Sequence, residues 1–468
     1  MMTGMIRDSD SSRRSFIQRV SAASAASIIP SPAWSGSKPG FRIAPFRFPV
    51  TPPVGHPLCG GWIAPVAAIE DDLEAVGFVL LGASDPIVVC AVDWTGLLND
   101  AYQVWRSALA EAAGTTPDRV AVQCVHQHDA PFVCLAGQRL LDEARSGLSV
   151  VALDFFHRCL SAGRAAVREA LPKARPVTHV GFGSAVVDRI ASNRRVDQGP
   201  DGKVRKMRGS SCRDADLIAM PEGLIDPLLR TVAFFEEDRK IAACHYYATH
   251  PMSHYGQGRV SSDFAGLARK RLQAEEPDCH HIYFTGCAGN LAAGKYNDGS
   301  PAARIQLTQR LFEALKSSQS AMPRSPLDRV RWRTHRFRPE APPQPAMDEL
   351  RAIVRKTDAS RVDRIRSAMR LAYTERLRNH APILLTALEL NEGSILHLPS
   401  ECFVEYQLRA QSMRRGQFVA SAAYGDGGPW YIPTRDEYPR GGYEVSMAFS
   451  ADSIDALLTA GIKDLLST

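Results

Sequence analysis

Two histidines separated by one residue, His126 and His128, follow directly on the apolar run 120–125. Residues two apart on a strand point to the same face, so we expect both imidazoles to address one site. His250 and Glu401 follow other apolar runs. Two imidazoles and a carboxylate around an open position form a known catalytic zinc set. The same residues could also be hydrogen-bonded side chains at strand ends, and spacing alone does not separate the two interpretations.

Four apolar runs lead straight into residues of this kind. They are 120–125 before His126, 241–248 before His250, 281–284 before the Gly-rich turn 285–290, and 395–398 before Glu401. In α/β proteins the carboxyl ends of strands form the crevice in which ligands bind. We therefore expect one site at the carboxyl edge of a sheet.

Short β-rich runs alternate with amphipathic helical stretches, which predicts an α/β fold with a mixed β-sheet core flanked by helices. The expected strands are 78–81, 87–92, 120–125, 241–248, 281–284, 383–390, 395–398 and 418–422. The expected helices are 97–113, 149–171, 264–275, 302–315 and 361–377. The proline-rich stretch 337–346 predicts a linker between two lobes.

Composition narrows the possible partners. The chain has 468 residues, 45% of them apolar, and a formal net charge of +6. Much of the surplus charge lies in local runs such as 329–333, which favours a solvated basic surface over nucleic-acid binding. The sequence has no stretch of 18 apolar residues, so we expect no transmembrane span. The ten cysteines contain no Cys-x-x-Cys pair, and most of them lie in apolar runs and are interpreted as small core residues. One or two disulfides stay open if the protein is exported. The oligomeric state does not follow from these patterns.

The first 33 residues are interpreted as a twin-arginine signal peptide rather than a disordered basic tail. Arg13 and Arg14 precede Phe16 and Ile17, and an Ala/Ser-rich apolar stretch follows. This order predicts export, to the periplasm or out of the cell.

Six blocks of the sequence, in order between residues 46 and 450, resemble the catalytic domain of neutral ceramidases. The blocks are 50–55, His-Gln-His-Asp-Ala-Pro at 126–131, Asn-Arg at 193–194, 248–253 with Ser-Asp at 262–263, Leu-Pro-Ser-Glu at 398–401, and 431–438 with Tyr-Glu at 443–444. The resemblance implies a zinc hydrolase domain over 41–468. It implies one zinc ion per chain, held by His126, His250, Glu401 and Tyr431.

The resemblance also implies that His128, Arg194 and Tyr443 line the reacting centre. On this basis we expect an amidohydrolase that cleaves an N-acyl amide bond, as in sphingolipid metabolism. Zinc-bound water would attack the amide. Arg194 and Tyr443 would stabilise the oxyanion, and His128 would transfer a proton. Arg194 could instead form a surface ion pair.

The sequence departs from the family pattern at three places. Cys287 stands in the Gly-rich turn where the family has a serine nearby, so it is either a nucleophile or a small turn residue, and we favour the turn. Backbone N–H groups of this turn could also face an anionic intermediate. Asp129 and Ala130 replace Ser-Gly, and the family's C-terminal β-sandwich domain is expected to be lacking. A different amide or ester substrate, or an idle binding protein of the same fold, therefore remains an alternative.

Overall fold

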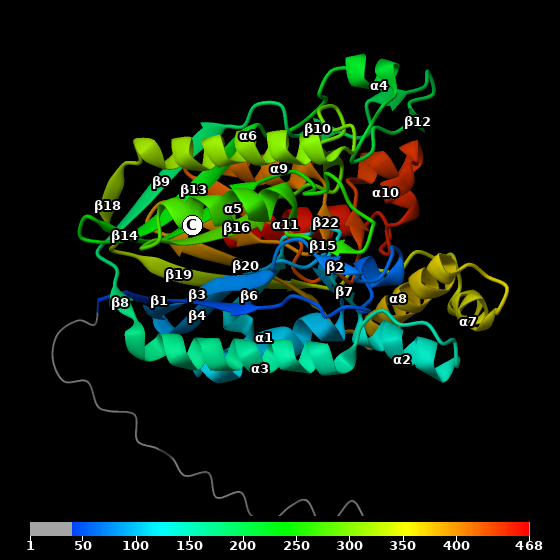
Figure 1. Cartoon of the computed structure of the whole chain (residues 1–468), viewed down its shortest axis with the longest axis horizontal. Helices are drawn as coiled ribbons and strands as arrows, with labels where there is room; N and C mark the ends of the chain where they lie inside the picture. Colours follow the sequence, from blue (N-terminus) through cyan, green and yellow to red (C-terminus); the bar gives the residue numbers. More distant parts are fainter. Residues whose placement is uncertain (1–39, 468) are drawn as a thin grey trace, which may run out of the picture. The chain divides into compact units, whose positions relative to one another are not determined.

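Three larger β-sheets with helices along their sides make up residues 40–467, the part of the chain that the computed structural model describes (Figure 1). The predicted signal peptide, residues 1–33, lies outside the described residues. From Gly40 onward the chain forms one compact unit. The prediction that 337–346 links two lobes is therefore wrong, because this stretch runs inside that unit.

Each larger sheet is mixed, with one parallel pair at an edge. The first has the order β6-β4-β3-β1-β8, the second β16-β14-β13-β9-β18 and the third β19-β20-β21-β23. The parallel pairs are β4 with β6, β14 with β16, and β21 with β23. The bounds in the first sheet are β1 (Arg42–Pro49), β3 (Glu74–Gly82), β4 (Ser84–Val92), β6 (Val120–Cys124) and β8 (Arg175–Pro176). Those in the second are β9 (His179–Val186), β13 (Leu228–Glu236), β14 (Arg239–Tyr247), β16 (His280–Thr285) and β18 (Arg324–Pro326). Those in the third are β19 (Val330–Phe337), β20 (Ile383–Leu390), β21 (Gly393–His397) and β23 (Val419–Ala422).

Helices accompany each sheet (Figure 1). α1 (Asp100–Ala113) and α3 (Leu153–Ala170) pack along the first sheet, and α5 (Asp263–Glu275) and α6 (Pro301–Ser320) along the second. α9 (Val404–Met413) and α11 (Ile454–Leu466) pack along the third. The other α-helices are α2 (Leu135–Glu143), α4 (Ala215–Ala219), α7 (Met347–Arg355), α8 (Arg361–Arg378) and α10 (Tyr443–Ser446). No helix in residues 40–467 is both long and apolar enough to cross a membrane.

The apolar run 87–92 becomes β4 because both faces of that strand are buried. Ile87 and Val89 join one hydrophobic core, whereas Val88 and Cys90 join the other. Successive side chains of a strand point to opposite faces, so a strand between two cores needs apolar residues throughout. This explains why the run could be recognised as a strand from sequence.

The strands that lead toward the predicted site come from three sheets, and not from one sheet as expected. β6 belongs to the first sheet, β14 and β16 to the second, and β21 to the third. Hydrogen bonds join their carboxyl ends: Thr285 Oγ1 donates to Val125 O at 2.6 Å, and the Ala423 N–H donates to Thr285 O at 2.9 Å. Three sheet edges therefore converge where one was predicted.

Gln123 connects the same ends from inside the core. Its side-chain Nε2 donates to the carbonyl oxygens of Leu398, Ala422 and Ala423 at 2.6–3.0 Å. The side chain is 1% exposed. β6 is thus fixed to the ends of β21 and β23, and the loop after β6 is placed against the loop that carries Glu401.

Candidate metal centre

Three predicted ligands, His126, His250 and Glu401, meet at the convergence of the three sheets. The Nε2 atoms of His126 and His250 are 3.2 Å apart. Glu401 Oε2 lies 3.1 Å from His250 Nε2 and 3.3 Å from His126 Nε2. All three side chains are buried, with exposed fractions of 1–5%. Residues more than 100 positions apart therefore place three ligand atoms together.

The other nitrogen of each ring fixes the tautomer that the neutral ring adopts. His126 Nδ1 lies 2.6 Å from the carbonyl oxygen of Thr95, and His250 Nδ1 lies 2.8 Å from that of Ala288. A carbonyl only accepts, so each Nδ1 carries a hydrogen and each Nε2 presents a lone pair. Burial also lowers the pKa of His250, which favours the neutral ring. When both rings are neutral, two lone pairs and the carboxylate oxygen therefore face one another.

This donor set fits a zinc ion. Tetrahedral zinc with bonds of about 2.0–2.1 Å requires neighbouring ligand atoms about 3.3 Å apart. The three separations of 3.1–3.3 Å match this spacing. Three acceptors at such distances repel one another unless a cation lies between them. Imidazole and carboxylate are ligands that zinc accepts.

Tyr431, the fourth predicted ligand, is held beside Glu401 by a short parallel ladder. β22 (Glu401–Cys402) pairs with β24 (Tyr431–Ile432), and Glu401 is the direct partner of Tyr431. The Tyr431 ring stacks near His250, with centroids 6.5 Å apart. Burial raises the pKa of the Tyr431 phenol well above its usual range, and Glu401 adds to this effect. The phenol is therefore neutral beside the three ligand atoms.

His128 lies at the edge of the same cluster. A ligand nitrogen of His128 lies within 4.8 Å of those of His126 and His250. Its Nδ1 contacts Cys59 Sγ at 3.7 Å, and its Nε2 is buried without a hydrogen-bond partner among the described residues. Burial lowers the pKa of His128 well below its usual value, and the two neighbouring histidines add to this. His128 thus offers a neutral ring with a free nitrogen.

Arg194 reaches the site from a second ladder, β10 (Ser192–Asn193) with β17 (Leu291–Ala292). Its Nη1 donates to the Tyr431 hydroxyl at 3.3 Å. Its guanidinium carbon lies 6.0 Å from the Tyr431 ring centroid and 5.5 Å from that of Tyr443. Tyr443 is 40% exposed and its ring lies 5.8 Å from the Tyr431 ring. Arg194 and Tyr443 therefore flank the side of the cluster that Tyr431 closes.

Arg194 is not a surface ion pair, the alternative that the sequence left open. Its Nε lies 3.3 Å from Glu444 Oε1, and Glu444 is completely buried. Arg195 Nη1 contacts the other Glu444 oxygen at 2.8 Å. A buried carboxylate between two guanidinium groups holds both in place.

Cys287 is 0% exposed and belongs to the hydrophobic core. Its backbone N–H donates to Gln407 Oε1, and those of Gly286 and Gly289 donate to Tyr247 O and Cys402 O. The expectation that N–H groups of this turn face an anionic intermediate is wrong for these three, because each already has a partner in the protein.

The backbone near the ligands departs from regular strand geometry. β6 ends at Cys124, and His126 has φ of +73°, so the two histidines do not alternate on a strand as expected. Ser400, before Glu401, and Trp430, before Tyr431, have φ of +52° and +62°. Left-handed conformations are unfavourable for residues with a Cβ and gather at functional sites. Turns, rather than strand alternation, aim these side chains at one point.

Sequence reasoning missed Tyr424, whose ring stacks on His126 with centroids 4.2 Å apart. Its φ is +63°, and its buried hydroxyl has no hydrogen-bond partner within residues 40–467. Gln123 and Glu444 were also missed as positioning residues. The sequence could have indicated Glu444, because it follows Tyr443 in a block that resembles the ceramidases. No sequence pattern marks an isolated buried glutamine such as Gln123.

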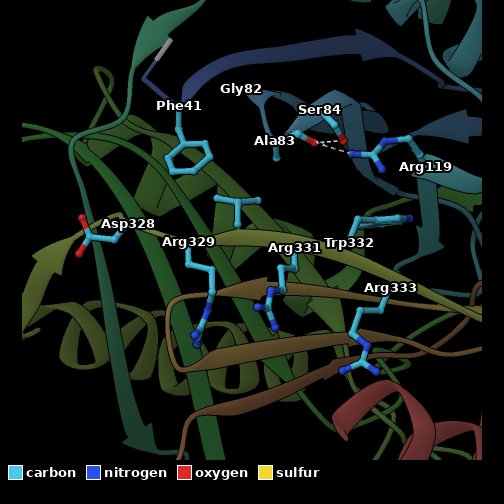
Figure 2. Close-up of a pocket in the computed structure, with 11 residues that line it drawn as sticks. Phe41, Gly82, Ala83, Ser84, Arg119, Asp328, Arg329, Arg331, Trp332 and Arg333 are labelled. Carbon is cyan, nitrogen blue, oxygen red and sulfur yellow. Dashed lines mark hydrogen bonds between the residues drawn. The ribbon is translucent and has the colours of Figure 1, made fainter. Parts of the chain in front are cut away.

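A hollow lined by arginines lies elsewhere in the structure (Figure 2). It is found at the amino ends of β4 and β6, beside Ser84 and Arg119, whereas His126 follows the carboxyl end of β6. Arg329 pairs with Glu392 at 2.9 Å and Arg333 with Glu389 at 3.6 Å. The hollow is separate from the candidate metal centre and its positive charge is partly compensated.

No protein-family model matches the sequence, and no curated protein matches it. Solved structures share its fold, and two of them are ceramidases. A structure described as "Ceramidase complexed with C2" aligns with a TM-score of 0.64 at 15% identity, and the neutral ceramidase from Pseudomonas aeruginosa with 0.63 at 14%. Each alignment covers 91% of this chain and 74% of the other. The chain therefore has the fold of the neutral ceramidases, which the sequence blocks predicted.

Proposed function

We propose that this protein is a zinc-dependent amidohydrolase that cleaves the N-acyl amide bond of a ceramide-like lipid. The observation that carries the proposal is the meeting of two imidazole lone pairs and a carboxylate oxygen at 3.1–3.3 Å. The fold shared with ceramidases supports the reaction class.

His126, His250 and Glu401 would hold the zinc ion, and Tyr431 would complete the set. Zinc supplies a water molecule of lowered pKa, about 7, and polarises a carbonyl group. The carbonyls of Thr95 and Ala288 keep both imidazoles in the ligating tautomer, which raises their basicity.

Arg194 and Tyr443 would donate hydrogen bonds to the oxygen of the amide as negative charge develops there. Each well-placed donor of this kind contributes about 3 kcal/mol to the lowering of the barrier. Glu444 supports this role, because its completely buried carboxylate lies 3.3 Å from Arg194 Nε and holds the guanidinium in place.

His128 would carry the proton from the attacking water to the leaving amine. A neutral imidazole with a free nitrogen can accept a proton and then release it. The unpartnered Nε2 of His128 provides such a nitrogen at the edge of the ligand cluster. Cys287 is treated as a turn residue, since its complete burial removes it from a substrate.

The test is hydrolysis of a short-chain ceramide, which is measured by the release of the free amine and the fatty acid. Purified wild-type protein should turn over this substrate, and dialysis against a chelator should abolish turnover until zinc is restored. A matched ester and a polar N-acyl amino acid distinguish substrate classes. Turnover of only these two would replace the ceramide proposal by a related zinc hydrolase. A zinc-loaded protein without turnover of any of the three would support a binding protein instead.

We also propose that the chain is exported by the twin-arginine pathway, on the strength of Arg13 and Arg14 before the apolar stretch. Replacement of both arginines by lysine should leave the full-length chain inside the cell, whereas wild type should lose its leader and leave. Unchanged export of the double variant would contradict this proposal.

A further inference from the structure

A second group of metal-binding side chains lies where α5 ends and β16 begins, far along β16 from the candidate metal centre. Glu276, Cys279 and His281 each offer a ligand atom, and the three atoms lie within 4.8 Å of one another. Cys279 is 4% exposed and His281 is 0% exposed. We call this group the β16 cluster. The proposed reaction uses none of its members.

A chain of hydrogen bonds from the core determines the tautomer of the histidine. Ser318 Oγ donates its only hydrogen to Leu315 O at 2.9 Å, so it accepts from Thr231 Oγ1 at 2.7 Å. Thr231 Oγ1 has then used its own hydrogen, and it accepts from His245 Nδ1 at 2.9 Å. His245 Nε2 is therefore a lone pair that accepts from His281 Nδ1 at 3.0 Å.

The consequence is a lone pair on His281 Nε2 that faces a carboxylate. His281 Nε2 lies 3.3 Å from Glu276 Oε2 and makes no hydrogen bond within the described part of the chain. Two acceptors at this distance call for a cation between or beside them, and the Lys240 ammonium, 2.5 Å from Glu276 Oε2, takes this role when no metal is bound.

We propose that Glu276, Cys279 and His281 form a second zinc site. A thiolate, an imidazole and a carboxylate are a donor set for zinc, and water would occupy the remaining position. The Cys279 thiol proton is released to solvent when the sulfur binds the ion. Part of the route from solvent is a surface hollow lined by Gln273, Pro277, Asp278 and Cys279.

Lys240 limits the affinity of this site. Its Nζ lies 2.5 Å from Glu276 Oε2 and 2.6 Å from Gln319 Oε1. The ammonium group compensates the carboxylate while no ion is bound, and zinc must displace it. Gln319 remains as its partner after displacement. The second site should therefore bind zinc more weakly than the candidate metal centre, where no ammonium group competes among residues 40–467.

Zinc content of the purified full-length protein tests the proposal. Wild type equilibrated with excess zinc and then desalted should hold about one ion per chain more than Cys279→Ser. The matched control Cys159→Ser, a buried cysteine of α3, should keep the wild-type content. His250→Ala should lose the other ion and keep this one. Equal zinc in wild type and Cys279→Ser would overturn the site.

Three further measurements keep the proposal open to refutation if Cys279→Ser misfolds. Glu276→Gln, in a partly exposed turn, should also lose the second ion. Lys240→Gln should tighten zinc binding at this site by at least about tenfold, because a competing positive charge is removed. Cobalt added to His250→Ala should give a thiolate-to-metal absorption band that Cys279→Ser lacks. An unchanged affinity in Lys240→Gln would contradict ligation by Glu276, and the absence of the band would contradict ligation by the Cys279 thiolate.

Discussion

His126 and His250 direct their Nε2 atoms at each other across 3.2 Å, although both Nδ1 atoms are already committed to backbone carbonyls. In the neutral tautomers that these carbonyls select, neither Nε2 can donate to the other, so no hydrogen bond holds the rings together. Glu401 adds negative charge at the same point. In the proposed function, a divalent cation between the three ligand atoms would remove this repulsion.

Arg194→Met should lower kcat about 100-fold and leave the zinc content unchanged. In the proposed mechanism the guanidinium group donates to the developing oxyanion and does not bind the metal, and loss of one such donor costs about 3 kcal/mol. Steady-state kinetics on the ceramide substrate measure the effect. Arg189→Met, an exposed arginine paired with Asp188, is the control and should retain wild-type turnover. Loss of zinc in Arg194→Met would assign the residue a structural role.

Cys287→Ser should retain most of the turnover. The thiol is completely buried in the hydrophobic core, and the serine hydroxyl has nearly the same volume. Activity and a thermal unfolding curve are measured on the same preparation. Complete inactivation of a folded variant would identify Cys287 as a nucleophile.

Gln123→Leu should destabilise the fold by about 2 kcal/mol, because the buried Ala423 O loses its donor, and Leu398 O and Ala422 O each keep only a backbone donor. Denaturant unfolding gives the change in free energy. Gln306→Leu, on the exposed side of α6, should stay within about 0.5 kcal/mol of wild type. A loss no larger than that of Gln306→Leu would mean that Gln123 does not join the sheets.

His56 should make the fold sensitive to acid. Its Nδ1 donates to Pro57 O at 2.6 Å, its Nε2 accepts from the Ala152 N–H at 3.3 Å, and burial lowers its pKa to about 4. The unfolded imidazole has a pKa of about 6.5, so the unfolded chain takes up the proton first as the pH falls. The free energy of unfolding should drop by up to about 3 kcal/mol between pH 6.5 and pH 4. Above pH 6.5 the contribution of His56 should stay constant.

Urea unfolding of His56→Asn across this pH range isolates the effect. The variant should be less stable than wild type at pH 7.5 and show a weaker loss toward pH 4. His157→Asn, an exposed histidine of α3, should keep the wild-type dependence. The same slope in His56→Asn and wild type would exclude His56 as the source.

Much of the secondary structure followed from the sequence, because buried strands and amphipathic helices carry a periodic signal. The run 383–390 coincides with β20, and the helix predicted at 361–377 is α8 to within one residue. β9 was missed because its burial is irregular and glycines interrupt it. β19 was missed because its arginines obscure the alternation.

The site itself was predictable as a set of residues but not as an arrangement. The motifs pointed to His126, His250 and Glu401, and the structure brings them together. The convergence of three sheets was not predictable, because it depends on long-range contacts such as those of Gln123. Strand alternation was the wrong reason for expecting His126 and His128 on one side, since a left-handed turn at His126 aims the rings.

The most direct test of the metal centre is the zinc content of wild type and His250→Ala after desalting, combined with anomalous diffraction at the zinc edge. We predict a tightly bound ion in wild type, with its anomalous peak between His126, His250 and Glu401. His250→Ala should lose this ion and all amidase activity. Active wild-type protein without zinc, or a peak that none of these three side chains contacts, would contradict the account.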